Sequence, residues 1–175
     1  MHSNLYLIGY RGSGKSTLAP LVAAKLGFSC VDTDQLLQEQ LSEPLKVFFA
    51  RSGEAEFRRL ETQVVCQVSQ GTNQVVSLGG GAILAQANQE AIRRTGRSVW
   101  LRCSLGTLSQ RLTKDQSQGA SRPSLTGLGV VEEIQAVLAV REPIYRDLAD
   151  LILDADNCST EELSDRIVAW WLSQD

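Results

Sequence analysis

A glycine-rich segment near the N-terminus has the residue types and spacing of a phosphate-binding loop. Residues 9–16, GYRGSGKS, match the pattern Gly-x-x-x-x-Gly-Lys-Ser and lie between an apolar run and a helix-forming stretch. Glycines let the backbone approach a ligand, so successive N–H groups can surround an anion, and the next helix adds its positive dipole end. We predict that Lys15 reaches the β- and γ-phosphates of a nucleotide and that the Ser16 hydroxyl binds Mg²⁺.

Two carboxylates follow the second apolar run, in the segment Asp32-Thr33-Asp34. The carboxyl ends of strands in an α/β sheet face the ligand crevice. We therefore expect Asp32 to hold Mg²⁺, directly or through water, and Asp34 to face the phosphate acceptor. The alternative is that Asp32 only caps the helix predicted over residues 35–41.

Arginines and glycines further along the chain fit a site for an anionic acceptor. Arg58 and Arg59 are adjacent on a predicted helix, where neighbours diverge by about 100°, so at most one can point into a given site. Both can instead form a solvated basic pair. Three glycines, 79–81, end the third apolar run and allow close approach of a ligand, unless they form a plain turn. Arg122 lies in a polar segment and Arg141 on a predicted helix.

The elements that must position these residues alternate along the chain. Apolar runs predict five strands, at residues 4–9, 28–34, 74–82, 98–103 and 150–155. Helical periodicity is clearest at residues 16–27, 53–71 and 160–174, and Pro20 is expected to bend the first of these helices. The alternation predicts an α/β fold with a five-stranded parallel sheet buried on both faces. Residues 114–129, polar and rich in Gly, Ser and Pro, are expected to form a loop whose part over about 114–126 is a mobile lid.

Together these segments resemble the shikimate kinase family. The phosphate-binding loop, the Asp-Thr-Asp segment, FRRLE, LGGGA, RPSL and REPIY occur in the order and spacing of that family, from about Leu5 to about Asp154. The resemblance implies a three-layer P-loop kinase fold with a mobile lid. It also implies transfer of the ATP γ-phosphate to the 3-hydroxyl of shikimate in aromatic amino acid biosynthesis, with Mg²⁺ as cofactor.

The resemblance further implies a role for each matched position. Asp34 would bind the shikimate hydroxyls and take the proton from the attacking one, and Arg122 would reach the transferring phosphate. Arg111 would stack on adenine, in a pocket completed near residues 154–157. The residues that would bind the nucleotide are Gly12, Ser13, Gly14, Lys15, Ser16, Thr17, Arg111 and Arg122. Those that would bind shikimate are Asp34, Arg58, Gly79, Gly80, Gly81 and Arg141. Mg²⁺ would be bound by Ser16 and Asp32, and the catalytic residues would be Lys15, Asp34 and Arg122.

Two departures from the family pattern concern the lid. The chain has RPSL where the family often has RPLL, and the stretch between Arg111 and Arg122 is longer, with QSQGA as the extra residues.

Two other functions compete with the resemblance. Another small kinase, for gluconate or a nucleoside monophosphate, would show a different acceptor pocket, and a nucleotide acceptor would need a surface that reads the base. A non-catalytic relative would be expected to lack Lys15, Asp34 or a pocket arginine, and none is missing.

Composition limits the remaining possibilities. A chain of 175 residues that is 43% apolar is expected to fold as one domain over residues 1–175. The net charge of -3 argues against a nucleic-acid partner, and the sequence has no apolar run of membrane-spanning length. Four dispersed cysteines and one histidine argue against zinc and predict buried free thiols. We expect a cytoplasmic monomer.

Overall fold

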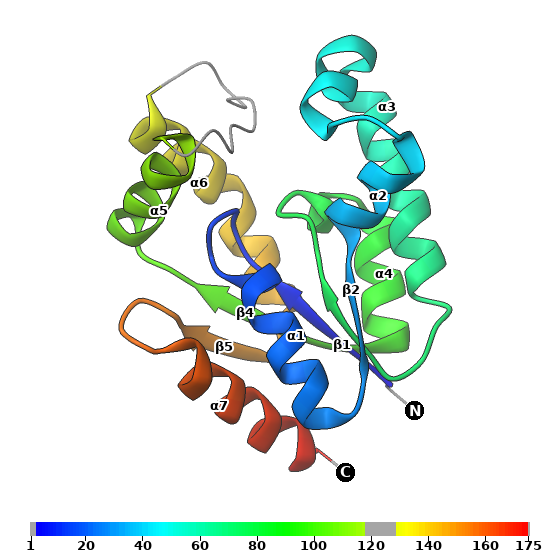
Figure 1. Ribbon diagram of the computed structural model, residues 1–175, viewed down its shortest axis with the longest axis vertical. Helices are drawn as coiled ribbons and strands as arrows, with labels where there is room; N and C mark the ends of the chain where they lie inside the picture. Colours follow the sequence, from blue (N-terminus) through cyan, green and yellow to red (C-terminus); the bar gives the residue numbers. More distant parts are fainter. Residues whose placement is uncertain (1–2, 118–128, 175) are drawn as a thin grey trace.

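Five parallel strands form the centre of the molecule, in the order β2-β3-β1-β4-β5 (Figure 1). The structure, a computed structural model of the chain, describes residues 3–117 and 129–174. The strands are β1 Asn4–Ile8, β2 Ser29–Asp32, β3 Gln74–Ser77, β4 Gly96–Arg102 and β5 Leu151–Asp154. The predicted parallel sheet is confirmed. The strand predicted over 74–82 ends at Ser77, where the chain leaves the sheet into the glycine segment.

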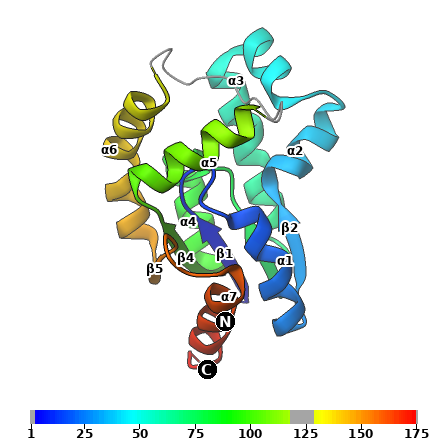
Figure 2. The same ribbon diagram turned by 60° about the vertical axis from the view of Figure 1, so that its left-hand side comes forward.

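Helices cover both faces of the sheet, which confirms the three-layer architecture (Figure 2). Helices α1 Lys15–Leu26 and α7 Thr160–Leu172 pack on one face, and α3 Leu45–Val68, α4 Gln86–Thr95 and α6 Val130–Leu148 pack on the other. The remaining elements are α2 Thr33–Leu41, the short 3-10 helix η1 Ala82–Leu84 and α5 Leu105–Ser117.

The central strand β1 is buried on both sides, as the apolar run predicted. Leu5 and Leu7 belong to the core beneath α1 and α7, whereas Tyr6 and Ile8 belong to the core beneath α3, α4 and α6. This alternation follows from the two-residue period of a strand. β1 pairs with β3 on one side and with β4 on the other, so its carboxyl end lies in the middle of the sheet edge.

Helix α1 agrees with the prediction to within one residue at each end and continues through the exposed Pro20. Two other helices differ from the prediction. Helix α3 begins at Leu45 and is interrupted at Gly53, whose φ of 79° is left-handed, so the helix predicted over 53–71 is the second part of a longer element. Helix α5 continues to Ser117, so residues 114–117 of the predicted loop are helical, which the good helix propensity of Lys and Gln favours. Residues 118–128 of the predicted lid lie outside the described residues.

The cysteines are free, as predicted, but they are not buried. Cys30 is exposed because its strand, β2, is at the edge of the sheet, and Cys66, Cys103 and Cys158 are half-buried. No helix within residues 3–117 and 129–174 is both long and apolar enough to cross a membrane.

The start of β4 depends on a glycine. Gly96 pairs with Asn4 of β1 in an extended conformation, and a Cβ at this position would overlap the Asn4 carbonyl and touch the Tyr6 ring. We predict that Gly96→Ala lowers the free energy of unfolding by about 1–3 kcal/mol or more, because overpacking here must push β1 and β4 apart. Urea unfolding followed by circular dichroism measures the change.

Gly106→Ala is the matched control. Gly106 lies in α5, and the nearest atom that an added Cβ would meet there is Ser104 Oγ at 3.9 Å. Alanine is the better helix former by up to about 1 kcal/mol, so this variant should be as stable as the wild type or more stable. Equal stability of the two variants would contradict the role given to Gly96.

Candidate active site

The phosphate-binding loop joins the carboxyl end of β1 to the first turn of α1. Its glycines have left-handed φ angles of 144° at Gly9, 76° at Gly12 and 99° at Gly14. At Gly9 a Cβ would also lie 2.8 Å from the Leu101 carbonyl oxygen, so both conformation and space require glycine there. The loop therefore presents backbone N–H groups and the N-terminus of α1 to the same hollow, which is the arrangement that binds phosphate.

Lys15 lies at the rim of this loop. It is the first residue of α1, its side chain is almost buried, and its Nζ donates to the carbonyl oxygens of Gly9 at 2.8 Å and Tyr10 at 2.9 Å. These contacts hold an ammonium group against the anion-binding backbone. That Lys15 reaches the phosphates of a nucleotide stays a prediction.

Asp32 connects the end of β2 to both the loop and the next helix. Its Oδ2 accepts a hydrogen bond from Ser16 Oγ at 2.6 Å, and its Oδ1 accepts from the backbone N–H groups of Asp34 and Gln35 at 3.0 and 3.2 Å. Asp32 therefore caps α2, and the same carboxylate also faces Ser16, so the cap does not exclude the predicted metal role. Within the described residues no group of three or more His, Cys, Asp and Glu side chains gathers as a metal cluster.

The serine and the carboxylate are nevertheless a suitable pair for Mg²⁺. This ion prefers oxygen ligands and is usually bound through one or two protein groups together with substrate phosphates and water. Ser16 and Asp32 bring one hydroxyl and one carboxylate to the edge of the phosphate-binding loop. The donor set fits the predicted metal.

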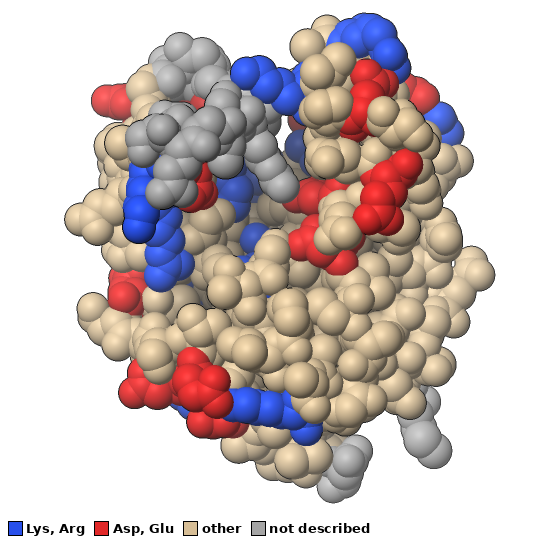
Figure 3. All heavy atoms as spheres, in the orientation of Figure 1, with Lys and Arg blue, Asp and Glu red and all other residues tan. Residues whose placement is uncertain are grey.

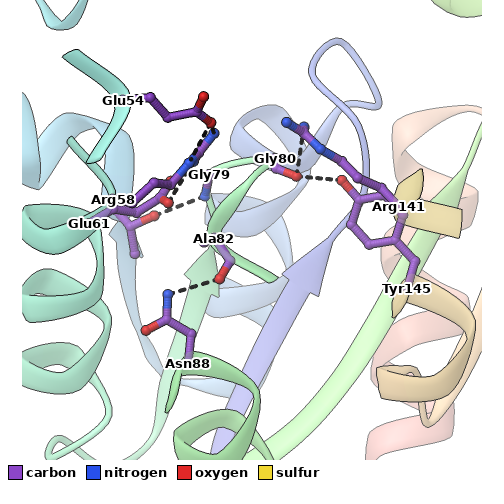
Figure 4. Close-up of polar contacts among 10 residues, drawn as sticks. Glu54, Arg58, Glu61, Gly79, Gly80, Ala82, Asn88, Arg141 and Tyr145 are labelled. Atoms are coloured by element: carbon purple, nitrogen blue, oxygen red, sulfur yellow. Dashed lines mark hydrogen bonds and ion pairs between the residues drawn. The ribbon is translucent and has the colours of Figure 1, made fainter. Parts of the chain in front are cut away.

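Of the two adjacent arginines on α3, only Arg58 points into the site. Its Nη1 donates to Glu61 Oε2 at 2.7 Å (Figure 4). The guanidinium also lies so close to Gly81 that a Cβ at that residue would overlap it. Arg59 instead pairs with Glu56 at 2.7 Å and is exposed. The predicted divergence of the two side chains is confirmed, and Arg59 is a solvated basic residue.

The glycine segment after β3 is held from several helices. Its Gly80 carbonyl accepts hydrogen bonds from Arg141 Nη1 at 3.0 Å and from the Tyr145 hydroxyl at 2.6 Å, both on α6 (Figure 4). Asn88 of α4 donates to the Ala82 carbonyl at 2.8 Å. Burial raises the pKa of Tyr145 to about 12, so this hydroxyl stays a donor at neutral pH. The segment is therefore a fixed backbone surface, not a loose turn.

Gly79 lies beneath two carboxylates. A Cβ at this position would be 2.6 Å from Asp34 Oδ1 and 3.0 Å from Glu61 Oε1. Glu61 was not among the predicted site residues. It is 4% exposed, and burial raises the pKa of its carboxyl although the Arg58 guanidinium opposes this. The three-residue spacing of Arg58 and Glu61 on one helix is the sequence signal that could have identified it.

Arg111 reaches the phosphate-binding loop from α5. Its Nη1 donates to the Gly12 carbonyl at 3.0 Å and its Nη2 to the Ala155 carbonyl at 3.4 Å. The guanidinium therefore joins the loop to the end of β5, on the side of the hollow where the adenine pocket was predicted. Arg122, the predicted lid arginine, lies outside the described residues.

Two cavities meet at the carboxyl edge of the sheet. The larger, of about 480 Å³, is lined by the loop residues 11–18, by Arg111 and by Ala155, and the smaller, of about 100 Å³, is lined by Arg58, Glu61, Gly81, Arg141 and the aromatic rings of Phe49 and Phe57. Figure 3 shows the hollow, with basic side chains in its depth and acidic ones at one rim.

Among the described residues, three line both cavities: Arg11, Asp34 and Gly80. The predicted nucleotide residues that the structure describes thus line one cavity, and the predicted acceptor arginines line the other. Asp34 stands where the two meet. This is the geometry of a site in which a group passes from one bound molecule to another.

Comparisons with known proteins point to one family. The family model for shikimate kinase matches residues 11–171. The shikimate kinase of Rhodopirellula baltica is 41% identical over 160 residues, which cover 91% of this chain and 86% of that protein. Shikimate kinase 2 of Photorhabdus laumondii is 38% identical over 155 residues, covering 89% and 88%.

Solved structures agree with the sequence comparison. The shikimate kinase of Acinetobacter baumannii in complex with shikimate superposes with a TM-score of 0.91 at 28% identity, covering 99% of this chain and 94% of that one. The shikimate kinase of Bacteroides thetaiotaomicron superposes with a TM-score of 0.86 at 31% identity, covering 97% and 98%.

The double contact of Asp32 generates a stability prediction. Asp32→Ala should lower the free energy of unfolding by about 0.5–2 kcal/mol because α2 loses its N-cap, whereas Asp32→Asn should change it by less than about 0.5 kcal/mol because asparagine caps equally well. Thermal and urea unfolding of the two variants measure the difference. An equal loss in both variants would show that the charge, not the cap, stabilises this corner.

Proposed function

The chain belongs to the shikimate kinase family, and we propose that the residues gathered at the carboxyl edge of its sheet carry out that family's reaction. The enzyme is an ATP-dependent phosphotransferase that moves the γ-phosphate of ATP to the 3-hydroxyl of shikimate, giving shikimate 3-phosphate and ADP. The observation that carries the residue assignment is the meeting of the two cavities at Asp34.

The larger cavity is assigned to ATP. The backbone N–H groups of residues 12–17 and the N-terminus of α1 bind the phosphate oxygens, and Lys15 contributes a positive charge to the β- and γ-phosphates. Arg111 holds the adenine side of the cavity against the loop. Phosphoryl transfer depends mainly on positioning and charge stabilisation, which these groups supply.

Ser16 and Asp32 are assigned to Mg²⁺. When bound, the ion neutralises charge on the β- and γ-phosphates during the transfer. The Ser16 hydroxyl faces the phosphates from the start of α1, and Asp32 is held in place by its cap contacts with α2. The carboxylate binds through water or directly.

The smaller cavity is assigned to shikimate. Arg58 and Arg141 reach the glycine segment from α3 and α6, and their planar guanidinium groups suit a carboxylate (Figure 4). Asp34 binds the hydroxyls of the acceptor and takes the proton of the attacking one. The backbone of residues 79–81 forms the floor, where glycine leaves room for the ring. Arg122 is assigned to the transferring phosphate on the family resemblance alone.

The competing functions fit the site less well. A cavity of about 100 Å³ lined by three arginines, a lysine, two carboxylates and glycine backbone suits a small hydroxylated acid better than a nucleotide. Lys15, Asp34 and both pocket arginines are retained, which argues against a non-catalytic relative. The five-stranded sheet of the described residues supports a single domain, and the monomer is proposed from the sequence alone. The cytoplasmic location is proposed from the family.

The adjacent arginines of α3 provide a matched test of the acceptor. Arg58→Ala should raise the KM for shikimate about tenfold to a hundredfold, because a charged hydrogen bond contributes about 1.5–3 kcal/mol. Arg59→Ala should leave it unchanged, because that side chain pairs with Glu56 away from the site. Steady-state kinetics with ATP, Mg²⁺ and shikimate, with ADP release as the readout, measure both.

The methyl ester of shikimate gives a second comparison. The ester should be a poor substrate for the wild type. The Arg58→Ala substitution should lower the activity with the ester far less than it lowers the activity with the acid. If wild type uses the ester as well as the acid, or phosphorylates gluconate or a nucleoside monophosphate faster than shikimate, the acceptor assignment is wrong.

The metal assignment makes a separate prediction. Asp32→Asn should raise the Mg²⁺ concentration needed for half-maximal activity by about tenfold or more, as changes near metal ligands do, while the unfolding temperature stays near that of the wild type. Glu39→Gln, on the exposed side of the same helix, is the control and should not change the Mg²⁺ requirement. An unchanged requirement in Asp32→Asn would remove Asp32 from the metal site.

A further inference from the structure

Arg11 occupies a position that the phosphate-binding motif leaves open to any residue. It is the third residue of the loop. In the part of the chain that the structure describes, the residues that line both cavities are Arg11, Asp34 and Gly80. Asp34 is acidic and Gly80 contributes backbone. Arg11 is therefore the cation at the boundary of the two cavities.

A buried carboxylate from another element holds this guanidinium. Glu133, in the first turn of α6, accepts a hydrogen bond from Arg11 Nη2 at 2.5 Å, and the side chains of Arg11 and Glu133 are 15% and 2% exposed. Glu133 lines neither cavity. It contacts Arg11, which lines both.

The same helix also holds the acceptor side of the boundary. Glu133, Arg141 and Tyr145 follow one another at multiples of four residues, so they lie along one face of α6. Glu133 holds the phosphate-binding loop, and Arg141 and Tyr145 hold the Gly80 carbonyl. One rigid element thereby sets the spacing of the two substrate-binding segments.

An apolar cluster lies beside the ion pair. Tyr10, the neighbour of Arg11, packs with Leu108 and Leu112 of α5 and with Ile134 of α6, and all four are almost completely buried. Exclusion of water strengthens an electrostatic contact but makes a buried charge expensive to keep. A buried ion pair is therefore weak evidence that the pair stabilises the fold, which leaves a role of Arg11 and Glu133 in function to explain the pair.

We propose that Arg11 is a catalytic residue that binds the transferring phosphoryl group, and that Glu133 is a positioning residue that fixes its guanidinium. The inference rests on the proposed function. In the transfer, the bond from the γ-phosphorus to its bridging oxygen breaks, a bond to the acceptor oxygen forms, and the acceptor proton passes to Asp34. Arg11 stabilises the charge on the phosphoryl oxygens as this happens, because this residue lines both cavities.

Two substitutions of Arg11 test the catalytic role. Arg11→Met should lower kcat about a hundredfold or more, as expected for loss of a cation at the transferring phosphate, while the dissociation constants of ADP and shikimate change much less. Arg11→Lys keeps a charge for Glu133 but loses the planar fork, and should lower kcat about tenfold or more. Isothermal titration calorimetry gives the dissociation constants, and Arg59→Met, outside the site, should behave as the wild type.

The positioning role of Glu133 is tested by a double-mutant cycle. Glu133→Gln should lower kcat about tenfold in the wild-type background and less than about twofold in the Arg11→Met background, since coupled residues are not additive. The exposed neighbour gives the control Glu132→Gln, which should have no effect. Added guanidinium should restore part of the activity of a third variant, Arg11→Ala, which a purely structural role would not allow.

The outcomes separate the inference from the proposed function. Wild type that releases no ADP in response to shikimate contradicts both. Active wild type with a folded Arg11→Met that retains more than a third of kcat overturns the inference alone. If Arg11→Met does not fold, Arg11→Lys with near-normal kcat overturns it equally. Equal losses from Glu133→Gln in both backgrounds would give Glu133 a role independent of Arg11.

Discussion

The parallel pairing of β1 with β3 and β4 is the constraint on which the rest of the structure depends. Parallel strands bring all their carboxyl ends to one edge, so the chain segments that follow β1, β2 and β3 emerge beside one another. Those segments are the phosphate-binding loop, the Asp32–Asp34 corner and the glycine segment. Helices cover both faces of the sheet, and both cavities form at this edge.

Buried charge around the acceptor cavity is organised by helices that pack on one face of the sheet. Glu61 and Arg58 come from α3, and Arg141 and Glu133 come from α6. Each of these charged groups contacts an oppositely charged side chain or a carbonyl oxygen, which offsets the free energy needed to remove it from water. The contacts also restrict rotation of the side chains. A site built in this way is arranged before substrates arrive, which is what phosphoryl transfer requires.

The fold departs from simple sequence periodicity at two places, Gly53 in α3 and the end of α5. The apolar pattern of α3 continues across Gly53, yet the left-handed backbone there divides the helix, and the part before it carries Phe49 of the acceptor cavity. In α5 the helix extends into residues whose polarity suggested a loop. Lys114 and Asp115 are exposed, as their polarity indicated, but polar residues can continue a helix that is already nucleated.

The sequence by itself determined the parallel α/β fold, the phosphate-binding loop and the separation of Arg58 from Arg59, because each follows from local periodicity or backbone stereochemistry. Only the tertiary structure decided that Asp32 both caps α2 and faces Ser16, that Glu61 joins the acceptor cavity, and that Arg11 meets Glu133. The last pair is separated by more than a hundred positions along the chain. Contacts of that kind depend on how α6 packs against the sheet, and no local pattern of residues encodes that distance.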